Sequence, residues 1–264
     1  MRKIEDPENN NQLEKIIDLI IHKSRNPLIK EKLPLYRDEL LNSRSIYIKG
    51  NLGQIKENND RILYQLYDYF HSIRDLRKIY DFLLNQSQHE KCPYCGGINE
   101  PNTLDHYLPR AKYAQYSILL RNLIPSCTQC NSNHKSIHSN ILFIHPYLDE
   151  ECIFNEQWIF AEITSIKKDN IKIEYECIPP EHWDRDLKDK VTGHYTTFGL
   201  SERYAICAKN ELFGKANTLE TLLSMKIPKE NIISIFESDI TRLSKNHWKY
   251  SCIKALIEYI NKNY

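Results

Sequence analysis

Four of the eight cysteines in this sequence stand in two matched pairs with C-x2-C spacing. The pairs are Cys92 with Cys95 and Cys127 with Cys130. A tight turn can present both thiolates of such a pair to one ion, and two pairs complete a tetrahedral four-sulfur site, which selects zinc. Unrelated buried cysteines or a single redox pair would not explain two matched spacings. We therefore predict a structural Zn²⁺ held by these four residues.

An Asp-His pair, Asp105–His106, lies between the two cysteine pairs. Adjacent residues of a strand point to opposite sides, so the carboxylate and the imidazole could approach a phosphate from different directions. A hard divalent cation prefers oxygen ligands, and an imidazole with a pKa of about 6.5 suits general-base catalysis at neutral pH. An Asp-His pair alone is more often structural than catalytic. The interpretation therefore depends on the residues around it.

The order of these features along the chain resembles the HNH endonuclease family. The sequence reads Cys-x2-Cys, Asp-His-x-x-Pro, Asn-Leu, Cys-x2-Cys-Asn and then Lys, over about residues 90–146. The resemblance implies hydrolysis of phosphodiester bonds in DNA, with RNA not excluded, and a catalytic Mg²⁺ or Mn²⁺ in addition to the zinc. A second reading is a module without catalysis that binds only nucleic acid or another protein.

The resemblance also implies roles for four polar residues of this segment. His106 matches the family's general base, and Asn122 matches the position whose side chain ties the loop and orients that histidine. Asp105 and Asn131 match the ligands of the catalytic cation. Some family members carry histidine where this chain has Asn131. Two nearby histidines could therefore coordinate the cation instead: His134 and His138.

The charge of the whole chain is +1, so attraction to phosphates must be local or supplied by a partner. The segment 91–145 has five basic and two acidic residues, which gives it a net charge of +3. Three of its basic side chains are candidate phosphate contacts, although each could equally be a solvated surface charge: Arg110, Lys112 and Lys135. Only seven glycines in 264 residues argue against a glycine-rich phosphate loop.

A wider resemblance involves the residues that follow this segment. The His-Pro-Tyr-x-Asp stretch at 145–149 and the helix start Phe198–Arg203 are similar to HNH proteins encoded beside ATPases in bacterial anti-phage systems, of the Septu or retron-linked kind. This resemblance implies an effector nuclease of a defence system that works with an ATPase partner. The first residues show no secretory signal and no apolar run could cross a membrane, so we expect a cytoplasmic protein.

Helical periodicity dominates the residues before this segment. Apolar residues recur every three or four positions in three stretches, at about 10–23, 36–43 and 54–86. Pro27 and Pro34 are expected to interrupt the chain before the second stretch, and the third is expected to break at most once. After the cysteine-rich segment, period-two alternation predicts strands at 158–163 and 171–178. Further helices are expected, with Ser201 as the first N-cap, at 201–213, 216–226, 229–243 and 246–261.

We therefore predict a mainly α protein with a small α+β module, in which a zinc-stapled ββα-metal core is flanked by helices and a β-hairpin. The expected regions are an N-terminal helical region at 1–89, an HNH nuclease module at 90–146, and a β-hairpin plus C-terminal helical region at 147–264.

Overall fold

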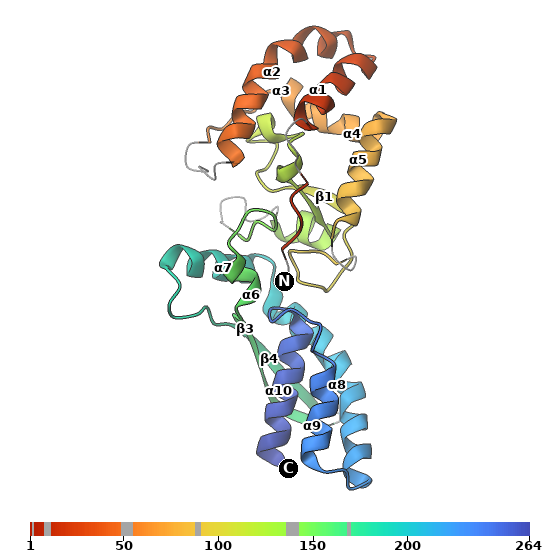
Figure 1. Ribbon diagram of the computed structural model, residues 1–264, viewed down its shortest axis with the longest axis vertical. Coiled ribbons are helices and arrows are strands. Elements are labelled where there is room, and N and C mark those ends of the chain that lie inside the picture. The colour runs from red at the N-terminus through yellow and green to blue at the C-terminus, as the bar shows by residue number, and fades with distance from the viewer. Residues whose placement is uncertain (2, 8–11, 49–54, 88–90, 136–142, 168–169) are drawn as a thin grey trace.

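The computed structural model describes residues 1–264 except 2, 8–11, 49–54, 88–90, 136–142 and 168–169 (Figure 1). The described chain is mainly helical, with two small antiparallel sheets of two strands each. The predicted mainly α class is therefore confirmed. Within the described residues, no helix is long and apolar enough to span a membrane.

The N-terminal part is a group of helices. Its elements are α1 (Gln12–Lys23), α2 (Pro27–Ile48), α3 (Arg61–Gln65), the 3-10 turn η2 (Leu66–Asp68), α4 (Tyr69–Ser72) and α5 (Arg74–Asn85). The predicted helix at 54–86 begins later than expected, because the Asp60 side chain caps α3 by accepting hydrogen bonds from the amides of Ile62 and Leu63. Ile73 is extended and breaks the helix once, between α4 and α5.

Helix α2 is longer than its sequence predicted. We expected a short helix at about 36–43, with Pro27 and Pro34 as interruptions. Pro27 instead occupies the first helical turn, where a missing N–H costs no hydrogen bond. The Asn26 carboxamide oxygen accepts a hydrogen bond from the amide of Leu28 at 3.0 Å and so starts the helix. Pro34 lies inside the helix on its exposed side, where water can satisfy the carbonyl that it leaves unbonded.

A short hairpin carries the residues of interest. Strand β1 (Thr103–His106) pairs with β2 (Leu123–Ser126), with Asp105 opposite Ile124 and His106 opposite Leu123. Two 3-10 turns, η4 (Ala114–Tyr116) and η5 (Leu120–Asn122), lie in the connection between the strands. A single helical turn, η6 (Gln129–His134), follows β2.

The C-terminal part packs helices on the second hairpin. That hairpin, β3 (Ile159–Lys167) and β4 (Asn170–Cys177), agrees with the predicted pair of strands. The helices are α6 (Glu151–Asn155), α7 (Arg185–Thr197), α8 (Leu200–Ser224), α9 (Lys229–Ser238) and α10 (Trp248–Asn263). Helix α10 packs against β3, and α8 packs against β4.

The C-terminal helices differ from the prediction in several ways. The stretches 201–213 and 216–226 form one continuous helix, α8, and the helix predicted at 229–243 ends at Ser238. Helices α6 and α7 were not predicted. Ser201 is not the N-cap, because Gly199 occupies that position in the left-handed conformation with a φ of 56°. The Ser201 hydroxyl instead donates a hydrogen bond to the Tyr175 carbonyl at 3.1 Å.

The β1–β2 hairpin lies between two hydrophobic cores. Leu104 and Leu123 belong to the core formed with α1 to α5, whereas Tyr107 and Ile124 belong to the core formed with the cysteines and the C-terminal helices. Figure 1 shows α1 to α5 at one end of the molecule and α8, α9 and α10 at the other. The apolar residues of the hairpin therefore contribute to both cores. The division into regions at 1–89, 90–146 and 147–264 stays a prediction.

Candidate active site

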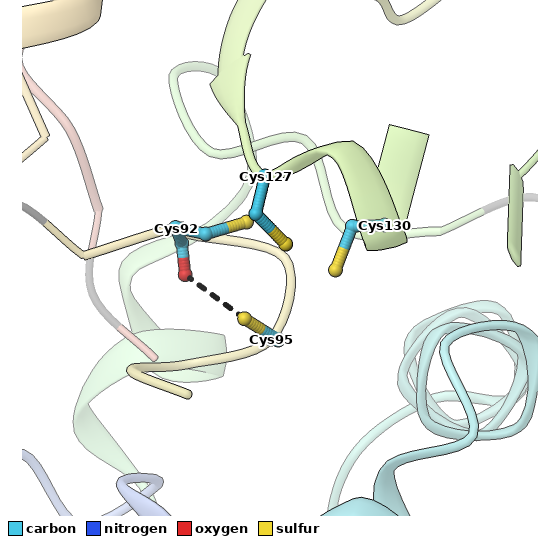
Figure 2. Close-up of side chains that lie close together, drawn as sticks. All are labelled: Cys92, Cys95, Cys127 and Cys130. Carbon is cyan, nitrogen blue, oxygen red and sulfur yellow. Dashed lines mark hydrogen bonds between the residues drawn. The ribbon is translucent and has the colours of Figure 1, made fainter. Parts of the chain in front are cut away.

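The four paired cysteines form one buried cluster. Their sulfur atoms all lie within 4.8 Å of one another. Cys92 and Cys95 come from one loop, Cys127 follows β2, and Cys130 is in the helical turn η6 (Figure 2). Burial raises the pKa of the Cys92 thiol, so a bare thiolate would be unfavourable there. Four converging sulfur donors fit a structural zinc ion, which would lower that cost.

Polar side chains outside the cluster donate hydrogen bonds to its sulfur atoms. The Arg203 guanidinium, from α8, lies 3.5 Å from Cys130 Sγ, and the Asn99 amide lies 3.8 Å from Cys127 Sγ. Arg203 also donates to the Phe198 carbonyl at 2.9 Å, which fixes its orientation. Donors to a metal-bound thiolate reduce its charge and orient it. The sequence pattern did not indicate this role for Arg203.

Asp105 is buried and paired. It is 4% exposed, and its Oδ2 accepts a hydrogen bond from the Tyr94 hydroxyl at 2.9 Å. The ammonium of Lys135 forms an ion pair with the same oxygen and also donates to the His106 carbonyl. Lys135 is 5% exposed, so in this arrangement it does not lie on the surface where a phosphate contact was expected.

The His106 side chain points to the other side of the strand. Its Nε2 lies 2.9 Å from the Ser117 carbonyl, and its ring meets the Tyr67 ring edge-on with centroids 4.5 Å apart. Because a carbonyl can only accept, Nε2 carries the hydrogen and Nδ1 keeps its lone pair. Burial, together with the positive charges of Arg110 and Lys135, lowers the His106 pKa to about 3, against the opposite effect of the hydrogen bond to the Ser117 carbonyl. The imidazole is therefore neutral at pH 7 and can accept a proton, but its pKa lies well below the value of about 6.5 that was expected for a general base.

Asn122 connects the His106 environment to the hairpin. Its side chain is fully buried, and its Oδ1 accepts hydrogen bonds from the Leu108 amide at 2.8 Å and the Tyr47 hydroxyl at 3.1 Å. Its Nδ2 donates to the carbonyls of Leu108 and Tyr116, each at 3.1 Å. Tyr116 directly precedes the residue whose carbonyl holds His106. The contacts of Asn122 are thus those of a residue that fixes the loop beside the imidazole.

The four cysteines, Asp105, His106 and Asn122 all lie in one short segment that matches a known family. Residues 92–136 match the HNH endonuclease family. The chain is also 34% identical over 173 residues to Protein ea31 of Escherichia phage lambda, an alignment that covers 62% of this chain and 55% of that protein. The chain therefore spans about half the length of this curated relative. No solved structure matches the chain.

Two of the three remaining cation-ligand candidates are described by the structure, one near the hairpin and one near the start of α8. Asn131 is partly buried, and its Nδ2 lies 3.5 Å from the hydroxyl of Thr103, at the start of the strand that carries Asp105. The His134 ring packs against Gly199 at the start of α8, where its Cε1 lies 3.2 Å from the position that a Cβ would take. His138 lies outside the described residues.

The two other basic candidates are partly exposed and paired with acids. The Arg110 guanidinium lies 3.0 Å from Asp68 and stacks over the Tyr64 ring at 4.2 Å. Lys112 lies 3.8 Å from Glu57. A phosphate would compete with these surface ion pairs, which contribute little stability.

Proposed function

We propose that this chain is a metal-dependent HNH endonuclease that hydrolyses phosphodiester bonds of DNA. The observation that carries the proposal is the neutral His106 imidazole, held through Nε2 by the Ser117 carbonyl, next to a buried carboxylate on the opposite side of the same strand. The position of both residues within the HNH match supports the same assignment.

His106 acts as the general base in this proposal. Its Nδ1 accepts a proton from the attacking water, and Asn122 is a positioning residue that holds the loop on which Ser117 lies. Asp105 and Asn131 offer oxygen ligands of the kind that Mg²⁺ and Mn²⁺ prefer, with His134 as the alternative to Asn131. When bound, such a cation stabilises negative charge on the phosphate and on the leaving oxygen. The four cysteines hold zinc, which is structural.

Arg110 and Lys112 are the proposed phosphate contacts at the surface. Arg110 is near enough to His106 to lower its pKa, so a phosphate bound by this guanidinium would lie close to the base. Lys135 can serve as a contact only after it leaves Asp105.

We also infer that an ATPase partner recruits or activates the nuclease in an anti-phage defence system. The net charge of +1 supports this inference, because it gives the chain little attraction for DNA on its own. The test is to co-express the chain with the product of a neighbouring ATPase gene and to measure co-purification and ATP-dependent cleavage. Full activity of the isolated chain at physiological salt, with no co-purification, would overturn this inference.

The nuclease proposal is tested by incubating purified protein with supercoiled plasmid and Mg²⁺ or Mn²⁺. His106→Ala should lower the cleavage rate by about 10²- to 10⁴-fold, which is the usual contribution of a general base. His182→Ala is the matched control, since that side chain is 69% exposed. Equal nicking by the wild type and His106→Ala would show that His106 is not the general base. Binding of plasmid without any cleavage would favour a catalytically silent nucleic-acid-binding module, and cleavage of RNA alone would correct the substrate.

A further inference from the structure

The hydrogen bonds that the structure gives the buried Lys135 ammonium go to two oxygen atoms, and the ammonium also lies 5.4 Å from the centroid of the Phe143 ring. It pairs with Asp105 Oδ2 and donates to the His106 carbonyl. Both members of the ion pair have side chains that are 6% exposed. A carboxylate oxygen and a backbone carbonyl oxygen are also the donors that hard divalent cations take in proteins. The two oxygen atoms that hold the ammonium are therefore donors that a divalent cation can also use.

A divalent cation and this ammonium cannot both contact Asp105 Oδ2. The oxygen already accepts a hydrogen bond from Tyr94 as well as the ion pair. A second positive charge would be repelled by the ammonium across a few ångströms of a water-poor interior, where such repulsion is only weakly screened. Lysine can withdraw, because its charge is a single point at the end of a flexible stem.

We propose that Lys135 and the catalytic divalent cation bind Asp105 alternately, so that Lys135 holds the carboxylate in the resting protein and leaves it when the cation binds. This inference rests on the proposed function for the identity of Asp105 as a cation ligand. It adds that cation affinity is reduced by the cost of displacing Lys135, and that the resting ion pair keeps the site closed.

The first experiment uses the wild-type protein with its zinc retained and no nucleic acid. Surface lysines are acetylated with a brief pulse of acetic anhydride, and each site is measured by mass spectrometry with and without Mg²⁺. Lys135 should be protected without Mg²⁺ and become at least tenfold more reactive with it, whereas Lys112, which is already 42% exposed, should not change. Protection of Lys135 that stays the same at saturating Mg²⁺ would overturn the proposal.

The second experiment measures Mn²⁺ affinity by electron paramagnetic resonance of the free ion. Lys135→Met keeps the length of the side chain and removes its charge, and should bind Mn²⁺ at least tenfold more tightly than the wild type. Lys254→Met is the matched control, because this lysine is 43% exposed on α10 and has no role in the proposed site, and it should bind like the wild type. Asp105→Asn should abolish the gain when combined with Lys135→Met. Unchanged or weaker binding by a folded Lys135→Met protein would refute the alternation.

Neither the acetylation nor the Mn²⁺ measurement requires cleavage, so the nuclease proposal and the alternation of Lys135 with the cation can be refuted independently. A protein that cuts DNA through His106 while Lys135 stays protected would retain the proposed function and lose this inference. Release of Lys135 by Mg²⁺ in a protein that cuts no nucleic acid would retain this inference and remove the nuclease proposal.

Discussion

Replacement of Asn122 by alanine should destabilise the protein strongly, because its side chain is fully buried and makes four hydrogen bonds. A hydrogen bond contributes about 1 kcal/mol net to stability, so their loss should lower the free energy of unfolding by about 4 kcal/mol. A change of this size corresponds to a fall in Tm of about 8–16 °C for a protein of this length. Asn122→Asp should also be destabilising, since it removes both donors and buries a charge.

The assay is urea unfolding followed by circular dichroism, with Asn217→Ala on the exposed side of α8 as the control. Below its own melting temperature, Asn122→Ala should also lose cleavage by about 10²-fold, because displacement of the loop by about 1 Å would misplace His106, the proposed base. If Asn122→Ala unfolds within about 1 kcal/mol of the wild type, the side chain is not the clamp that its contacts describe.

Three further predictions follow from the cysteines and the buried histidines. Cys92→Ser should reduce bound zinc well below one equivalent per chain and lower the Tm, as measured by metal analysis and calorimetry; a zinc-free variant with unchanged Tm would contradict a structural ion. Arg203→Met should weaken zinc binding by about 10- to 100-fold in competition with a chelator, with partial rescue by Arg203→Lys; unchanged retention would remove the role of the guanidinium. Burial lowers the pKa values of His145 and His194 to about 3, so protonation of the unfolded chain favours unfolding as the pH falls below about 6.5. Each of the two histidines should lower the free energy of unfolding by about 2 kcal/mol between pH 7 and pH 5, measured by urea unfolding. Equal stability at the two pH values would show that the histidines are not buried in the neutral form.

The sequence predicted those features that depend on short spacing. Two C-x2-C pairs were sufficient to predict the cysteine cluster, and the alternation of a strand was sufficient to place Asp105 and His106 on opposite sides. Local capping explains why α2 begins earlier than predicted: Pro27 was expected to interrupt the chain, but it begins the helix because Asn26 caps it. A cap of this kind can be recognised in a sequence once the proline is considered as a first helical residue.

The partners of the candidate site could not be predicted, because they come from distant parts of the chain. Arg203 is 73 residues from Cys130, and Tyr47 is 75 residues from Asn122. Lys135 was recognised as a cation near the site, but a sequence gives no means of deciding between a buried carboxylate and a phosphate as its partner. Such contacts depend on how the two hydrophobic cores pack against the two faces of the hairpin.

The position of the β1–β2 hairpin between two cores limits how far this protein can be shortened. A fragment cut at residues 92 and 136 would expose apolar side chains on both faces of the hairpin, including Leu123 on one face and Ile124 on the other. Both flanking regions contribute contacts to the site. The Tyr67 ring packs against the His106 imidazole, and the Phe198 ring stacks on Tyr94, whose hydroxyl binds Asp105. We expect a fragment limited to the HNH match to aggregate, and engineering should start from the whole chain.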